Sequence, residues 1–403
     1  MRRAFSLFGF IAVLVLSAAC GTVATQTNTA PPPSSGGTPP SASFSDDPNV
    51  PHGNTAVVLG ANFTDPTGTL GLLPINAPRT AVKNLQTTHS DAVLRSYGGL
   101  LYVVNRLGGD NIEVVDPSDF QVLSQFTVGE GTNPQDLIAL SATKAYVSLY
   151  EPENNRTDGL DVDDLIIINP QTGAIAKTID LTPFTANDGA RFARVSDLLK
   201  VGGKIFAAVQ DLGNDLSLAA DQPGKIVAID TATDGIVDSA VLACRDPVAM
   251  AYSNETHFIY VACADYFNLA SPYGGVEVVD PSTLTSLGLF VTDNDLAGAP
   301  GDIEVSGGRG FLTVGTSNAG KEIYSTSVVS FALDVNGDPD VRTLYEGTAY
   351  IQDIAVDENG LLLVGDRDPS VNGVLFLDPA DGDVIAGPIN TGPLVSSIAF
   401  VER

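Results

Sequence analysis

Residues 101–120 read LYVVNRLGGDNIEVVDPSDF, in which two β-branched runs flank a glycine-rich joint and an Asp-Pro pair follows the second run. Similar stretches return at 144–173, 258–284 and 361–382. Apolar runs rich in Val, Ile and Tyr that are bounded by Gly, Asp and Pro are typical of short β-strands joined by tight turns. Because the unit recurs every roughly 40 to 55 residues, the sequence predicts a repeat protein of the propeller kind.

Each unit contains four short β runs, which we call strands a, b, c and d in chain order within a blade. Complete units begin near residues 91, 136, 195, 247, 302 and 352. The front of the chain, 54–85, supplies only b, c and d, while the last residues, VSSIAFVER at 395–403, supply a lone a strand. We therefore expect an all-β, seven-bladed β-propeller over residues 51–403, closed by strands from both termini so that no sheet edge is left open.

The turn after strand c repeats an Asx-Pro pair. It occurs as Asp116-Pro117, Asn169-Pro170, Asp280-Pro281 and Asp378-Pro379. An Asx residue at the first position and Pro at the second position favour a type I turn. These aspartates are therefore interpreted as structural.

The N-terminal residues differ in composition from the repeats. Residues 1–20, MRRAFSLFGFIAVLVLSAAC, have a basic start and an apolar run, and they end on small residues before a cysteine, which predicts an export signal. Their end is similar to a bacterial lipobox, so Cys20 is the expected lipidation site; simple cleavage and secretion is the alternative. Residues 21–50 are rich in Pro, Ser, Thr and Gly and predict a disordered linker. The expected location is the periplasm or the cell surface.

The repeat also carries a family resemblance. YVVN at 102–105, followed by IEVVDPSDFQVLSQFTVG at 112–129, resembles the repeat of YVTN-type β-propellers. That resemblance implies a seven-bladed fold and export. It implies no single activity, because a fold does not fix a function.

Composition excludes several classes of function. The formal net charge is −28, and no Lys or Arg cluster is visible, so nucleic acid is not an expected partner. The chain has only three histidines, His52, His89 and His257, which lie far apart, so a histidine metal cluster is not expected. Tryptophan is absent, so the tryptophan-rich repeats of quinoprotein propellers are missing. No nucleophile elbow, zincin or P-loop motif occurs. We expect contact with a membrane only through the lipid anchor, and a monomer.

Long loops between strands b and c predict the ligand face. They span 150–163, 210–224, 264–275 and 316–326, and long loops on a rigid scaffold commonly carry recognition. The candidate ligand-face residues from the first of them are Tyr150, Glu151, Asp158, Asp161, Asp163 and Asp164. Ca²⁺ prefers oxygen ligands, so Asp158, Asp161 and Asp163 form a candidate metal site; a solvated acidic loop is the alternative.

Aspartates also align at the start of strand a. The expected set around the channel mouth is Asp91, Asp136, Asp197, Asp302 and Asp353, with Val248 and Ser397 in the other two blades. Asp136 and Asp197 complete the candidate ligand face. Capping of the turn between strands d and a is the alternative role for these carboxylates.

Two classes of function remain open. The first is a non-enzymatic extracytoplasmic binding or scaffold propeller that presents its acidic loops to a ligand or protein partner. The alternative is a lactonase-like hydrolase in which channel-mouth carboxylates hold Ca²⁺. Carbohydrate binding by Tyr150, Tyr266 and Tyr273 is a third idea.

Two cysteines lie within the repeats, Cys244 and Cys263. A two-residue hairpin turn at Ser253-Asn254 would pair positions whose numbers sum to 507, and these cysteines do so. An exported protein retains disulfides, so we expect Cys244 and Cys263 to be bonded.

Overall fold

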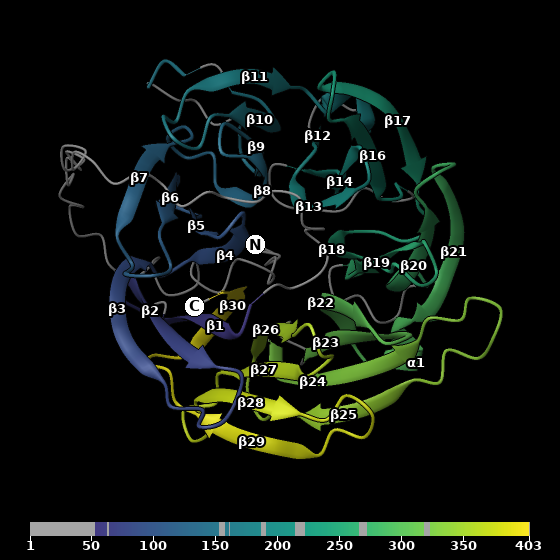
Figure 1. The fold of residues 1–403 in the computed structure, drawn as a ribbon. Helices are drawn as coiled ribbons and strands as arrows, with labels where there is room; N and C mark the ends of the chain where they lie inside the picture. Colours follow the sequence, from purple (N-terminus) through teal and green to yellow (C-terminus); the bar gives the residue numbers. More distant parts are fainter. Residues whose placement is uncertain are drawn as a thin grey trace, which may run out of the picture.

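The computed structural model describes residues 53–62, 64–152, 158–160, 162–186, 191–213, 222–265, 272–317 and 323–402. In these ranges the chain forms seven four-stranded antiparallel sheets arranged around a central axis (Figure 1). The predicted seven-bladed propeller is therefore confirmed. None of the helices in the described ranges has the length and apolar character needed to cross a bilayer.

Blades 1 to 4 contain the following strands, given in the order a to d. Blade 1 comprises β30 (Val395–Val401), β1 (Thr55–Ala61), β2 (Thr67–Pro74) and β3 (Val82–His89). Blade 2 comprises β4 (Ala92–Tyr97), β5 (Leu100–Asn105), β6 (Asn111–Val115) and β7 (Val122–Thr127). Blade 3 comprises β8 (Pro134–Ser141), β9 (Lys144–Leu149), β10 (Leu165–Ile168) and β11 (Ile175–Ile179). Blade 4 comprises β13 (Val195–Val201), β14 (Lys204–Val209), β16 (Lys225–Asp230) and β17 (Gly235–Val241).

Blades 5 to 7 follow the same order. Blade 5 comprises β18 (Pro247–Tyr252), β19 (Ile259–Cys263), β20 (Gly275–Asp280) and β21 (Thr285–Thr292). Blade 6 comprises β22 (Ala299–Ser306), β23 (Arg309–Ser317), β24 (Ile323–Ala332) and β25 (Arg342–Glu346). Blade 7 comprises β26 (Ile351–Val356), β27 (Leu362–Asp366), β28 (Gly373–Leu377) and β29 (Val384–Ile389).

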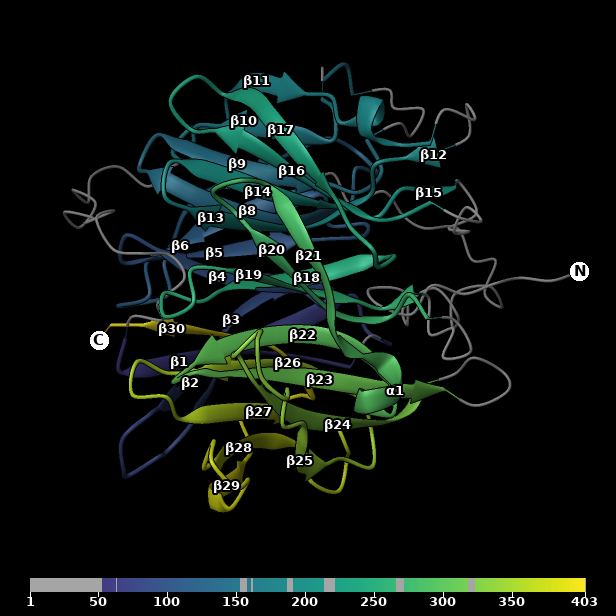
Figure 2. The same cartoon turned by 90° about the vertical axis from the view of Figure 1, so that its right-hand side faces the viewer.

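The two faces of the ring differ in their connections. Because the strands alternate in direction, the a–b and c–d turns share one face, which we call the turn face. The b–c loops and d–a connections share the other, which we call the looped face. The looped face also carries the paired strands β12 (Arg191–Phe192) and β15 (Leu212–Gly213), η3 (Thr182–Phe184) and α1 (Asp293–Leu296). Figure 2 shows β12, β15 and α1 on the same side of the ring, with α1 well apart from the two strands.

The ring closes as predicted. β30 pairs with β1 from Thr55 opposite Val401 onward, so the two ends of the described chain share one sheet. The side chain of Arg367, which follows β27 in blade 7, fastens this junction. Its guanidinium donates to the carbonyls of Ala61 (2.9 Å), Val395 (2.8 Å) and Leu394 (3.1 Å). Blade 7 therefore holds both terminal strands at once.

Inter-blade cores explain why the apolar runs form these strands. Strands b and c are almost wholly buried, and their side chains pack against strands a and b of the next blade. Tyr102 and Val104 of β5, for example, pack with Leu137 of β8 and Val147 of β9, and all four are at most slightly exposed. The unbroken apolar character of LYVV thus reflects a strand buried on both of its faces.

The c–d turns are the Asx turns that the sequence predicts. Asp116 Oδ1 accepts from Ser118 N at 2.8 Å, Asn169 Oδ1 from Gln171 N at 2.9 Å, and Asp378 Oδ1 from Ala380 N at 2.9 Å. Their carboxylate and amide oxygens are engaged by the turn backbone, which fits a structural role.

Blade 5 contains the predicted disulfide, but the strand register from which it was predicted is wrong. Cys244 and Cys263 are bonded, with an S–S distance of 1.99 Å and a Cα–Cα distance of 6.0 Å. The expected register is wrong, however, because Cys263 pairs with Pro247 in the β18–β19 ladder. Ser253 Oγ accepts from the next turn residues, Glu255 N and Thr256 N, which lengthens the hairpin turn beyond two residues. Cys244 reaches Cys263 from the segment before β18.

Candidate functional site

The inner-strand aspartates link neighbouring blades. Four side chains accept a backbone N–H from the inner strand of the following blade: Asp136 Oδ2 from Leu198 (3.0 Å), Asp197 Oδ2 from Met250 (2.7 Å), Asp302 Oδ2 from Ile354 (3.0 Å) and Asp353 Oδ2 from Ile398 (2.6 Å). Ser397 Oγ continues the series by accepting from Leu94 N at 3.1 Å. The structure thus brings these residues together as a belt of inter-blade hydrogen bonds, not as caps of single turns.

Two positions of the expected ring are wrong. The belt pattern places Val93, not Asp91, at the equivalent position of blade 2, and Ala249, not Val248, in blade 5. Asp91 lies before β4 and accepts from Arg106 Nε at 2.9 Å. The inner strands of blades 4 and 5 carry β-bulges near this level, whereas the β4–β5 ladder of blade 2 is regular, and such differences shift an alignment that is made from sequence alone.

The acidic belt is partly neutralised by an arginine. Arg95 of β4 donates from Nε to Asp136 Oδ1 at 2.6 Å, and its NH2 lies 4.0 Å from Asp197 Oδ1. Burial raises the pKa of Asp197 well above its ordinary value, and the neighbouring Asp136 carboxylate raises it further. The Asp197 carboxyl therefore keeps its proton to a higher pH than an exposed aspartate would, because a buried carboxylate beside a second acid resists ionisation.

A second carboxylate group lies between blades 6 and 7. Burial raises the pKa of Asp353 well above its ordinary value, with Asp302 as the next cause. Glu304, two residues after Asp302 on β22, has its pKa raised to about 8 by burial and by the Asp302 charge. Glu304 was missed in the sequence because it has no counterpart in the other repeats.

Tyr150 and Glu151 open the b–c loop of blade 3 but form part of a packed cluster. Tyr150 is only 5% exposed, and its hydroxyl donates to Gln210 Oε1 at 2.6 Å. The guanidinium of Arg194 lies 5.2 Å from the Tyr150 ring centroid, and its NH1 lies 3.2 Å from Glu151 Oε1. Tyr150 is therefore wrong as an exposed stacking residue.

The remaining tyrosines considered for sugar binding give little support. Tyr273 is partly exposed, and the Arg245 guanidinium lies 3.8 Å from its ring centroid, which covers one ring face. Tyr266 lies outside the described residues, as do Asp161 and Cys20.

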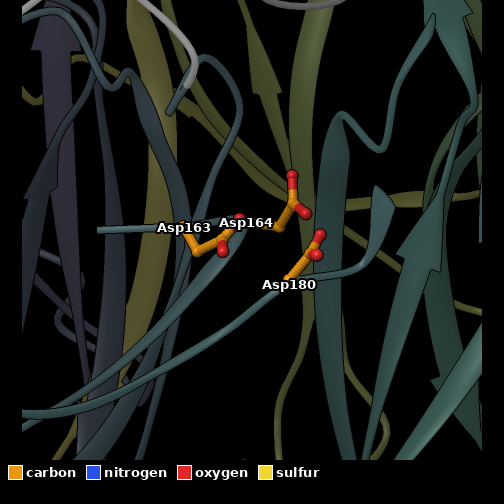
Figure 3. A group of neighbouring side chains, drawn as sticks. All are labelled: Asp163, Asp164 and Asp180. Atoms are coloured by element: carbon orange, nitrogen blue, oxygen red, sulfur yellow. The ribbon is translucent and has the colours of Figure 1, made fainter. Parts of the chain in front are cut away.

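Three carboxylates gather at the start of the blade 3 outer ladder. Asp163, Asp164 and Asp180 each bring an oxygen within 4.8 Å of the others (Figure 3). Asp164 is fully buried, Asp163 is half-buried and Asp180 is exposed. Three carboxylates suit a hard cation such as Ca²⁺, which would need further oxygen ligands to reach its usual six to eight.

This group overlaps only in part with the predicted metal site. Asp163 belongs to both, but the exposed Asp158 lies elsewhere, where its Oδ2 accepts from Glu130 N at 2.6 Å. Asp180 was missed, although strand pairing gives a signal for it. Leu165 pairs with Ile179, so the residues one place beyond each, Asp164 and Asp180, face one another.

Comparison with known proteins identifies the fold and no family. No protein-family model and no curated protein matches the chain. Among solved structures, one from Bacteroides uniformis that is named a "putative 6-phosphogluconolactonase" has a TM-score of 0.57 at 13% identity, covering 86% of this chain and 99% of that chain. A Lactobacillus plantarum protein has a TM-score of 0.56 at 14% identity, covering 87% of this chain and 100% of that chain. The dihydro-heme d1 dehydrogenase NirN has a TM-score of 0.50 at 16% identity, covering 90% of this chain and 77% of that chain. At these identities the likeness is one of fold.

Proposed function

We propose that this protein is a YVTN-type extracytoplasmic binding propeller, lipid-anchored through Cys20, that holds a ligand or partner protein on its looped face and does not turn it over. The observation that carries the proposal is the belt of inner-strand aspartates. Asp136 and Asp197, two of the carboxylates that could serve a channel-mouth hydrolase, accept hydrogen bonds from the next blade and lie beside Arg95. These two carboxylates therefore serve to join neighbouring blades.

Ca²⁺ is the first ligand to test, at Asp163, Asp164 and Asp180. If Ca²⁺ binds only the folded state, it stabilises that state by about 2.7 kcal/mol at a hundredfold excess over the dissociation constant. We expect Ca²⁺ to raise the melting temperature more than Mg²⁺ or Na⁺ at matched ionic strength. Asp163→Asn combined with Asp180→Asn should remove this excess. Asp381→Asn, at an exposed c–d turn of blade 7, is the matched control and should retain it.

Equal shifts with the three cations would leave the acidity of the looped face as a solubility feature and remove Ca²⁺ as its ligand. Isothermal titration calorimetry of the protein with Ca²⁺ tests the same binding directly, without heating the protein. Asp161→Asn, in the same loop, extends the comparison to the originally predicted residues.

A hydrolase is the second candidate, and Glu304 is the observation that favours it. Without a bound cation, the pKa of Glu304 is raised to about 8, so its carboxyl is protonated at neutral pH and fits the role of a general acid. In that function Asp302 and Asp353 would hold Ca²⁺, which would polarise a lactone carbonyl. The lactonase name of the Bacteroides uniformis structure is a fold-level analogy only.

A screen of lactones and aryl esters, with and without Ca²⁺, separates the two functions. The binding proposal expects no turnover above that of heat-denatured protein. Saturable, Ca²⁺-dependent turnover that Glu304→Gln abolishes would replace it with the hydrolase. Glu304 is a better probe than Asp136, because Asp136→Asn also disturbs the link between two blades.

A further inference from the structure

A pocket of about 390 Å³ lies on the turn face, between blades 4 and 5. Its walls include Lys204, Phe206, Tyr252, His257, Phe258 and Pro281. This volume is within the range that accommodates small organic ligands, and aromatic walls with a few polar groups are typical of such sites. The pocket is on the opposite face from the acidic loops and independent of the proposed function.

The equivalent place between blades 3 and 4 is filled by an internal ion pair. There, Lys144 at the start of β9 donates to Asp234 Oδ1 at 2.5 Å and to the carbonyl of Thr231 at 2.8 Å. The Tyr146 hydroxyl also donates to Asp234 Oδ1. The lysine, its acid and the c–d turn of the next blade therefore form a closed set.

Blade 4 repeats this lysine without the acid. Lys204 starts β14 as Lys144 starts β9, and its Nζ lies 3.4 Å from the carbonyl of Pro281, the turn residue that corresponds to Thr231. Leu284 replaces Asp234: it is the fifth residue of its turn and has the same φ of 55°. Phe206 likewise stands in the place of Tyr146.

Lys204 thus has the backbone contact of its counterpart but no carboxylate. Among the described residues it forms no ion pair. The nearest acid in the pocket wall is Asp280, whose Oδ1 accepts from Ser282 N at 2.8 Å and Ser282 Oγ at 2.6 Å. The position beside the Lys204 ammonium therefore suits the carboxylate of an external acid.

We infer that this pocket binds a small organic carboxylate with a flat aromatic or apolar body. Its carboxylate takes the place that Asp234 occupies one blade earlier and pairs with Lys204. Its body packs on Tyr252 and Phe258, which are only partly buried by the protein. His257, whose Nδ1 lies 3.3 Å from the Tyr252 hydroxyl, adds a polar group at the rim. Phe206 forms the floor.

The test is titration of the full chain with phenylacetate and with its neutral analogue phenylacetamide, followed by calorimetry or NMR. We expect phenylacetate to bind with a dissociation constant of about 1 mM or below and roughly tenfold more tightly than the amide, a difference of ~1.4 kcal/mol. Lys204→Met should bring the acid down to the affinity of the amide. Because the pair is partly exposed, added salt should weaken the acid selectively.

Two further variants compare the blade 4–5 pocket with the blade 3–4 interface of the same protein. Leu284→Asp transplants the acid of the blade 3–4 interface, so it should occupy Lys204 and abolish binding of phenylacetate. Lys144→Met removes the lysine that is already paired and should leave binding unchanged. Should Leu284→Asp fail to fold, Lys204→Met decides alone. The inference is overturned if acid and amide bind alike, if Lys204→Met binds the acid as the native protein does, or if no binding occurs by about 10 mM.

Discussion

Replacing Asp136 with alanine tests the belt of inter-blade hydrogen bonds. The Asp136 carboxylate is 1% exposed, pairs with Arg95 at 2.6 Å and accepts Leu137 N at 2.7 Å and Leu198 N at 3.0 Å. Asp136→Ala leaves Arg95 without this partner and removes the acceptor of a buried amide in the next blade. The first effect acts on Arg95 of blade 2 and the second on Leu198 of blade 4, so Asp136→Ala weakens the inner edge of blade 3 on both sides.

The size of the effect follows from these contacts. Breaking a buried ion pair by removing one partner costs about 3 to 5 kcal/mol, and because the Arg95 side chain is 32% exposed the lower figure is the better guide here. The propeller predicted over residues 51–403 has 353 residues, and an unfolding entropy of about 2.1 cal/mol/K per residue gives roughly 0.74 kcal/mol per kelvin. Asp136→Ala should therefore lower the melting temperature by about 4 °C.

Circular dichroism melting of matched variants checks this expectation. Asp378→Ala is the control, because Asp378 is near the surface in a c–d turn and loses one hydrogen bond to Ala380 N. That loss is about 0.5 to 1.5 kcal/mol, or at most about 2 °C. If Asp136→Ala and Asp378→Ala have the same melting temperature, the Asp136 carboxylate is not a structural link between blades. The argument that it is unavailable for catalysis then fails.

Three other predictions follow from the structure. Deleting residues 394–403 removes β30, so β1 becomes an exposed edge and the protein should aggregate in light scattering; a soluble variant with unchanged melting would refute the closure. Alkylation of the denatured, unreduced protein should find Cys244 and Cys263 blocked, and mass spectrometry that shows two labelled thiols would disprove the bond. The raised pKa of Glu304 means that the free energy of unfolding falls as pH rises from about 4.5 to about 8. A single proton sets a limit of about 1.4 kcal/mol per pH unit, and the fall should be smaller than this because the side chain is partly exposed. Glu304→Gln should remove this fall and leave stability at pH 4 unchanged, and identical pH profiles would contradict the assignment.

The strands and their closure were predictable because they depend on local patterns. VSSIAFVER has the length and apolar character of an inner strand, and the front of the chain lacks one, so pairing β30 with β1 needed only a count of strands. The Asx-Pro turns were likewise recoverable, since Asp116 or Asp378 satisfies its own backbone within two residues.

The candidate site was predictable only in part. The aspartates of the belt were found by alignment, but other inner strands carry bulges that the β4–β5 ladder of blade 2 lacks, which is why Asp91 was misplaced. Arg95 and Arg367 act on neighbouring blades, and nothing in their own repeats signals those contacts. The register of the blade 5 hairpin was wrong because Ser253 Oγ accepts from Glu255 N and Thr256 N, which makes the turn longer than the two residues expected.

The position of β1 also determines how the ring responds to force. A pull through the segment that precedes Thr55 enters the second strand of a sheet, not an edge strand. β1 has seven residue pairs with β2 on one side and six with β30 on the other. Tension along the axis of β1 therefore shears both ladders together, whereas tension on an outer strand such as β29 would peel one ladder bond by bond. A propeller pulled at this end therefore bears load first through its closing sheet, and next through Arg367 of blade 7, which bonds to both terminal strands.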